Sequence, residues 1–132
     1  MSWKRILDHD RVRKIEGSFS WIDHRFITGG FLKELSTLEI LLYFFLVAVS
    51  DRNGISFYHD DRICTILKIP LTSLGEAREN LILRSLILYE PPLYQVLSLP
   101  PRPLIPPTRE EIRQRQRDRN LYHIRKIQEA LP

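Results

Sequence analysis

The sequence predicts a fold of the α+β class: a mainly helical domain with a small β-hairpin, followed by a separate C-terminal helix. Three observations predict it. Residues 37–49 are almost uniformly apolar, residues 58–99 combine two helical patterns with two strand patterns, and residues 100–107 are rich in proline. The 132-residue chain therefore divides into four segments, which are an N-terminal basic arm (1–17), a folded domain (18–99), a proline-rich linker (100–107) and a basic C-terminal helix (108–132).

The domain is expected to begin with a short strand. Phe19, Trp21 and Ile22 follow the punctuating Gly17, and the glycines after Thr28 mark the next turn. We expect a structural role for the aromatic residues. Stacking on nucleic acid bases would require exposed rings beside several basic residues, and only one arginine lies nearby in the sequence.

Residues 37–49 predict the core helix. Ser36 and Glu39 have the spacing of a capping box, in which each side chain satisfies an unpaired backbone N–H group at the helix start. The segment is so uniformly apolar that we expect burial on most sides. The sequence Asp-Arg-Asn-Gly at 51–54 ends the helix in a turn, and residues 55–58 alternate as a short strand.

Two further helices and a hairpin complete the domain. Apolar residues at helical spacing predict a helix over 60–69 that Pro70 ends. Ser73 and Glu76 form a second capping box, which predicts a helix over 73–85. Strand patterns at 86–89 and 93–97 flank the turn Pro91-Pro92. Helix, strand, two helices and two strands are the order of a winged helix-turn-helix.

The same residues carry a family resemblance. The sequence DDRICTILKIPLTSLGEARENLILRSLILYE resembles the winged helix-turn-helix pattern, with a Leu-Lys-Ile turn before the recognition helix and a Leu-Ile strand that begins the wing. Upstream, SWIDHRF and LSTLEILLYFFLVAVSDRNGISFY are similar to the start of bacterial replication-initiation and primosomal proteins of the DnaD type, and of small proteins of mobile elements. The resemblance covers residues 18–99. It implies DNA binding in replication, transposition or transcription control of a mobile element. Pro70 and Leu71 stand where such families usually have a small polar residue.

The C-terminal segment predicts a helix with two different halves. Thr108 and Glu111 form a third capping box, and the helix is expected to extend to about Ala130. The first half places arginines four residues apart in two rows, which are Arg109, Arg113 and Arg117, and Arg115 and Arg119. The second half carries an apolar strip that needs a partner, either its own domain or a second copy: Leu121, Ile124, Ile127 and Leu131.

Charge is divided unevenly along the chain, whose formal net charge is +4. Residues 1–16 hold five basic and three acidic side chains, residues 17–99 hold seven and nine, and residues 100–132 hold eight and four. A basic balance favours a polyanionic partner, chiefly nucleic acid. Any electrostatic attraction to duplex DNA therefore comes mainly from the two arms.

Candidate DNA contacts lie on the second helix of the pair and on the tail. Arginine and asparagine suit contacts to base edges or phosphates, whereas two glutamates on the same helix oppose them. The candidates are Thr72, Ser73, Arg78, Asn80, Arg109, Arg113, Arg115, Arg117 and Arg119. The alternative is a protein-interaction module or accessory subunit that recruits a helicase, a transposase or a ribonucleoprotein, with homodimerisation through the tail helix.

The sequence gives no support to an enzyme. The four histidines lack metal-ligand spacing, and no nucleophile elbow or glycine-rich phosphate loop is present, so we expect neither cofactor nor catalysis. Cys64, the only cysteine, allows no intrachain disulfide and is expected to be an inert buried thiol, which favours the cytoplasm. The longest apolar run, 40–49, is too short for a membrane span.

Overall fold

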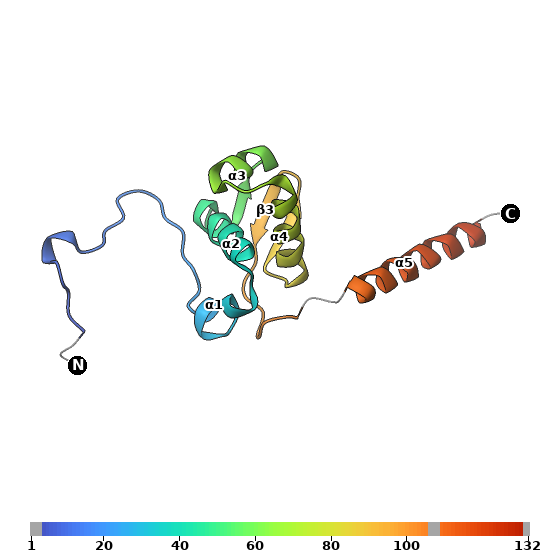
Figure 1. The fold of residues 1–132 in the computed structure, drawn as a ribbon, viewed down its shortest axis with the longest axis horizontal. Helices are drawn as coiled ribbons and strands as arrows, with labels where there is room; N and C mark the ends of the chain where they lie inside the picture. The colour runs from blue at the N-terminus through green and yellow to red at the C-terminus, as the bar shows by residue number, and fades with distance from the viewer. Residues whose placement is uncertain (1–3, 106–108, 131–132) are drawn as a thin grey trace.

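The computed structural model of the chain describes residues 4–105 and 109–130. Helices pack against one face of a small sheet, and an N-terminal arm and a C-terminal helix extend from the domain (Figure 1). The α+β class is confirmed. The elements are the 3-10 turns His9–Arg11 and Leu32–Glu34, the helices α1 (Arg25–Thr28), α2 (Thr37–Val49), α3 (Asp60–Leu67), α4 (Leu71–Leu83) and α5 (Arg109–Ala130), and the strands β1 (Ile55–Phe57), β2 (Ile87–Glu90) and β3 (Leu93–Val96).

Helix α2 begins where the capping residues predict. The Ser36 hydroxyl accepts a hydrogen bond from the Glu39 N–H at 3.3 Å and donates one to the Glu39 carboxylate at 2.7 Å. The expected burial on most sides is wrong, because α2 buries one stripe against its neighbours. Leu42 and Leu46 are fully buried, whereas three large apolar side chains are exposed: Leu38, Leu41 and Phe44.

The three strands form one antiparallel sheet in the order β1-β3-β2. Tyr94 of β3 is paired with Ser56 of β1 and with Tyr89 of β2. The predicted hairpin is confirmed, with the peptide bond between Pro91 and Pro92 in the cis form. The first strand therefore pairs with the last. The sheet packs against α2 through β3 and against α4 through β2.

Helix α4 differs from its prediction at its start. The capping box at Ser73 and Glu76 is wrong, because the helix begins at Leu71 and its N-cap is Pro70, which makes no side-chain capping bond. Lys68 ends α3 in the left-handed conformation, with φ 58°. The chain then needs only Ile69 and the extended Pro70 to enter α4, so Thr72 and Ser73 lie inside the first turn.

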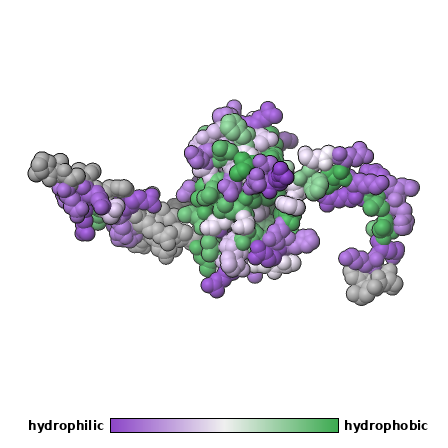
Figure 2. Space-filling view, turned by 180° about the vertical axis from the view of Figure 1, so that it is seen from behind, coloured by the Kyte–Doolittle hydropathy of each residue, from purple (hydrophilic) through white to green (hydrophobic). Residues whose placement is uncertain are grey.

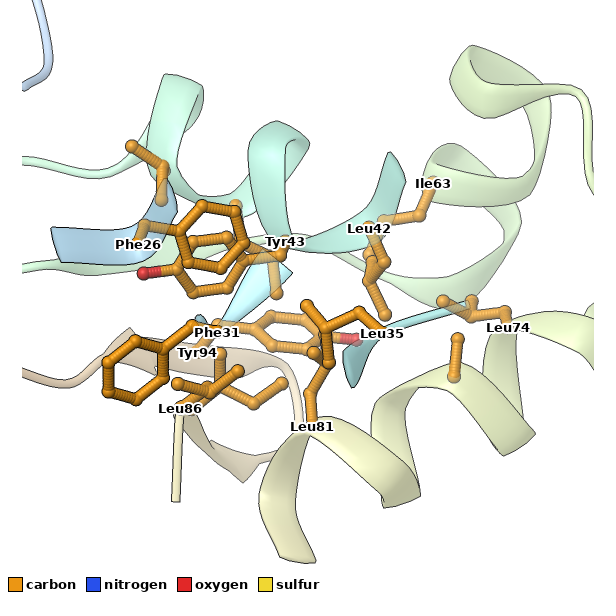
Figure 3. Packing of buried hydrophobic residues seen from close by; sticks show 14 of the residues in the cluster. Phe26, Phe31, Leu35, Leu42, Tyr43, Ile63, Leu74, Leu81, Leu86 and Tyr94 are labelled. Carbon is orange, nitrogen blue, oxygen red and sulfur yellow. The ribbon is translucent and has the colours of Figure 1, made fainter. Parts of the chain in front are cut away.

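The N-terminal segment also corrects its prediction. No strand forms at residues 19–22, and Phe19 and Trp21 are exposed, with the Trp21 side chain 77% exposed. The segment is held instead by Ser20, whose hydroxyl lies 3.0 Å from the Ser50 carbonyl oxygen. Phe26 takes the core position and stacks on Tyr43, with ring centroids 4.5 Å apart (Figure 3).

One hydrophobic core joins the helices to the sheet (Figure 3). Leu42 and Leu46 of α2, Leu74 and Leu81 of α4, and Ile87 of β2 are all fully buried. Cys64 packs against this cluster and is only partly buried, so the expected full burial of its thiol is wrong.

Gly54 is the position where a side chain would cost most. Its φ is +83°, and an added Cβ would overlap the backbone carbonyl oxygen of Val96, where β1 approaches β3. Gly75, inside α4, has nothing within 4 Å of an added Cβ. We expect Gly54→Ala to lower the unfolding free energy by at least about 2 kcal/mol and Gly75→Ala to raise it by about 0.5–1 kcal/mol. Urea unfolding followed by circular dichroism measures both. Equal effects of the two substitutions would contradict the turn geometry.

Tyr43 predicts an alkaline loss of stability. Burial raises the pKa of Tyr43 to about 12, and the nearby Asp23 carboxylate adds to the rise. Burial raises the pKa of Tyr94 to about 12 as well. Unfolded tyrosine ionises near pH 10, so between pH 10 and 12 the unfolded chain binds fewer protons and the unfolding free energy falls as pH rises. Each tyrosine contributes about 1.4 kcal/mol per pH unit. Tyr43→Phe should make this fall shallower than in the wild-type chain, and an identical slope would refute the assignment.

Candidate nucleic-acid interface

The exposed face of α4 is acidic. Thr72, Glu76 and Glu79 are exposed along it, and Ser73 is partly exposed. The face is open to solvent, so the helix is free to meet a partner. Its two carboxylates repel the phosphates of DNA, and the cationic or amide side chains that could offset them are engaged elsewhere.

Arg78 is held inside the domain. Its guanidinium donates hydrogen bonds to both carboxylate oxygens of Asp60, at 2.7 and 3.3 Å, and to the Tyr94 hydroxyl at 2.9 Å. It also lies 4.1 Å from the centroid of the Tyr89 ring. Burial opposes the charge, but the hydrogen bonds with Asp60 and Tyr94 outweigh it and raise the pKa of Arg78. Its side chain is 16% exposed.

This geometry opposes the predicted contact of Arg78 with DNA. Reaching a phosphate would break a bidentate ion pair, which is costly when the partner carboxylate stays behind. The sequence already indicated an internal position for Arg78. Arg78 lies four residues after Leu74 and four before Ile82, on the side of α4 that faces the hairpin.

Asn80 is engaged as well. Its amide nitrogen lies 3.3 Å from a carboxylate oxygen of Glu39, and the other oxygen lies 3.6 Å from the Arg84 guanidinium. Glu39 is buried, so these contacts join the start of α2 to the end of α4. Asn80 therefore makes an internal contact between helices, which competes with its predicted contact to a base.

The tail carries accessible arginines. Helix α5 extends from the domain in Figure 1, and Figure 2 shows hydrophilic residues along both arms. Arg113, Arg117 and Arg119 are exposed, and only the backbone of Arg109 and Arg115 is described. The capping box at Thr108 lies outside the described residues. The two arginine rows therefore lie on a helix, and the arginine side chains that the structure describes are open to solvent.

Two exposed cations on the folded domain were not among the predicted DNA contacts. Arg62 of α3 and Lys68 between α3 and α4 are both exposed. Arg62 lies in the first turn of α3, and Lys68 lies three residues before α4, where Thr72 and Ser73 occupy the first turn. The Leu-Lys-Ile turn was the available signal, because Lys68 is its only polar residue.

Other kinds of site find no support in residues 4–105 and 109–130. Within these ranges no three His, Cys, Asp or Glu side chains gather in a way that could hold a metal ion, and no helix has the length and apolar character of a membrane span. Comparisons with family models, with curated proteins and with solved structures found no match. Geometry and charge are therefore the basis for a functional assignment.

Removal of the Arg78 side chain should affect stability and leave DNA affinity unchanged. We expect Arg78→Ala to lower the unfolding free energy by about 2–3 kcal/mol, because Asp60 and Tyr94 both lose a charged partner. Arg62→Ala, an exposed arginine one helix away, should change it by less than about 0.5 kcal/mol. Urea unfolding measures both variants. An Arg78→Ala chain that is as stable as Arg62→Ala but binds DNA more weakly would show that Arg78 is a DNA contact.

Proposed function

We propose that residues 36–99 form a winged helix-turn-helix. Its support is the order α2-β1-α3-α4-β2-β3 together with the pairing of β1 and β2 on either side of β3. In this assignment α3 and α4 are the helix pair, Lys68 lies in the turn between them, and the hairpin around Pro91-Pro92 is the wing.

The function we infer is non-enzymatic binding of duplex DNA, with affinity supplied mainly by the basic tail. The observation that carries it is the set of exposed arginines on α5, beside a domain that is slightly acidic. Each phosphate that an arginine neutralises releases counterions, so several such contacts give strong, salt-dependent and sequence-independent affinity. From the resemblance of residues 18–99 we infer a role in replication, transposition or transcription control of a mobile element.

The folded domain contributes positioning in this proposal. Arg62 on α3 and Lys68 in the turn before α4 contact phosphates, and Thr72 and Ser73 remain the candidates for contacts to base edges. Neither offers the bidentate donors that distinguish guanine or adenine most strongly. Discrimination between DNA sequences should accordingly be small.

A second function has one specific observation in its favour. Glu76 and Glu79 are exposed on α4 while Arg78, Asn80 and Arg84 contact other parts of the domain. Such a face suits a basic protein partner, for example a replication or transposition factor or a ribonucleoprotein. In this case α4 binds protein, and DNA contacts are confined to the arms.

The arginine rows can be tested by salt dependence. Fluorescence anisotropy of labelled duplex DNA gives the binding constant across a salt series. Arg113→Ala combined with Arg117→Ala should weaken binding equally for all sequences and reduce the slope of log K against log salt by about two. A chain that binds no duplex at roughly 100 mM salt, or a double variant with an unchanged slope, would contradict DNA binding by the tail.

The glutamates of α4 separate the two functions. If α4 lies against DNA, Glu76→Gln combined with Glu79→Gln should tighten binding several-fold, because two repulsive charges are removed from the phosphate field. An unchanged binding constant in the same assay would assign α4 to a protein partner. Glu34→Gln is the control, since it removes an exposed carboxylate that lies outside α4.

A further inference from the structure

The sheet has one buried and one uncovered face. Side chains alternate along each strand, so those of Ser56, Ile87 and Tyr94 point into the core, where they are buried. Their neighbours point outward on the opposite face, which we call the outer sheet face: Ile55, Phe57, Leu88, Glu90, Leu93 and Gln95. Four of these six are large apolar residues.

This outer sheet face is exposed in the chain as described. Phe57 is 63% exposed, Leu88 is 52% exposed and Leu93 is 43% exposed. A shallow groove of about 370 Å³ lies over it, lined by Ile55, Leu88, Glu90, Leu93 and Gln95 together with Ile82, Tyr89 and Tyr94. Figure 2, seen from behind the view of Figure 1, shows hydrophobic residues gathered over the domain. A contiguous apolar face of this kind marks a contact surface.

Helix α5 presents a second uncovered apolar surface. Leu121 is 54% exposed and Ile124 is 49% exposed. Of the remaining predicted strip, only the backbone of Ile127 is described, and Leu131 lies outside the described residues. The strip covers less than two heptads, and Arg113, Arg117 and Asn120 occupy the positions that would continue it. Coiled coils need apolar heptads over three or four repeats, so two α5 helices would not pair with each other stably.

The two surfaces match in size and charge. Residues 121–130 of a helix extend about 14 Å, and four residues of a strand extend about 13 Å across a three-strand sheet about 10 Å wide. Glu90 is the one charged residue of the outer sheet face, and it is acidic. Arg125 is exposed four residues after Leu121 on α5. Docking therefore brings a carboxylate and a guanidinium together around an apolar centre.

We propose that the C-terminal half of α5 docks on the outer sheet face of a second copy of the chain. Reciprocal exchange gives a closed two-fold dimer in which both apolar surfaces are covered. The linker favours a second copy over the helix's own domain. Residues 97–108 include five prolines and no glycine, a composition that favours a semi-rigid, extended spacer over the chain reversal needed to reach its own sheet. This inference is independent of DNA binding.

Sedimentation of the full chain tests the dimer. The wild-type chain should sediment as a dimer at micromolar concentration, and Leu93→Asp and Ile124→Asp should each convert it to a monomer. Because both side chains are exposed in one copy, circular dichroism should show both variants folded. Lys126→Asp, on the opposite side of α5 from Ile124, is the control and should remain a dimer. A wild-type monomer at every concentration would overturn the proposal.

Crosslinking identifies the surfaces. In a Cys64→Ser background, one chain carries Leu93→Cys and a differently tagged chain carries Ile124→Cys. A bismaleimide should join the two tags in the mixture, and far less so when Lys126→Cys replaces Ile124→Cys. Preferential linkage of Ile124→Cys to itself would assign the contact to paired α5 helices. A single chain that carries both Leu93→Cys and Ile124→Cys tests the remaining case. If its two cysteines link only within that chain, α5 folds back on its own sheet. Either result would overturn the proposal.

Discussion

The bidentate ion pair between Arg78 and Asp60 is the interaction on which the arrangement of this domain depends. Asp60 begins α3, Arg78 lies in the middle of α4, and the Tyr94 hydroxyl brings in β3 through the same guanidinium. The Tyr89 ring covers it from β2. Two helices and the hairpin therefore meet at one charged group, largely shielded from water. At the other end of α4, Asn80 and Arg84 contact Glu39 of α2 in a similar way.

These internal contacts determine which charges a partner can meet. Once Arg78, Asn80 and Arg84 hold the domain together, α4 presents Glu76 and Glu79, and Lys68 is exposed three residues before its start. The domain has other exposed cations, Arg25, Lys33, Arg52 and Arg62, but basic residues are most numerous on α5. Stability and electrostatic attraction are thus assigned to different parts of the chain. A protein built this way can bind a polyanion strongly while distinguishing little between sequences.

Local signals in the sequence predicted most elements of the domain. The capping pair Ser36 and Glu39 and the uniformly apolar segment located α2, and Pro91-Pro92 located the hairpin. The start of α4 was missed because Ser73 and Glu76 imitate a capping box while Pro70 already begins the helix. Burial of α2 was overestimated, since periodicity cannot say how many neighbours a helix has. The partners of Arg78 lie 16 and 18 residues away, so only the folded chain brings them together.

Hydrogen–deuterium exchange with and without duplex DNA distinguishes binding through the basic tail from binding through α4, because it reports on each segment separately. Slower exchange on addition of duplex is predicted in the arginine-rich half of α5 and around Lys68, where basic side chains are exposed in the free chain. Amides near Arg78 and Tyr94 should exchange at the same rate in both samples, since their contacts are internal. Protection confined to residues 76–80 of α4, with α5 unaffected, would contradict the account.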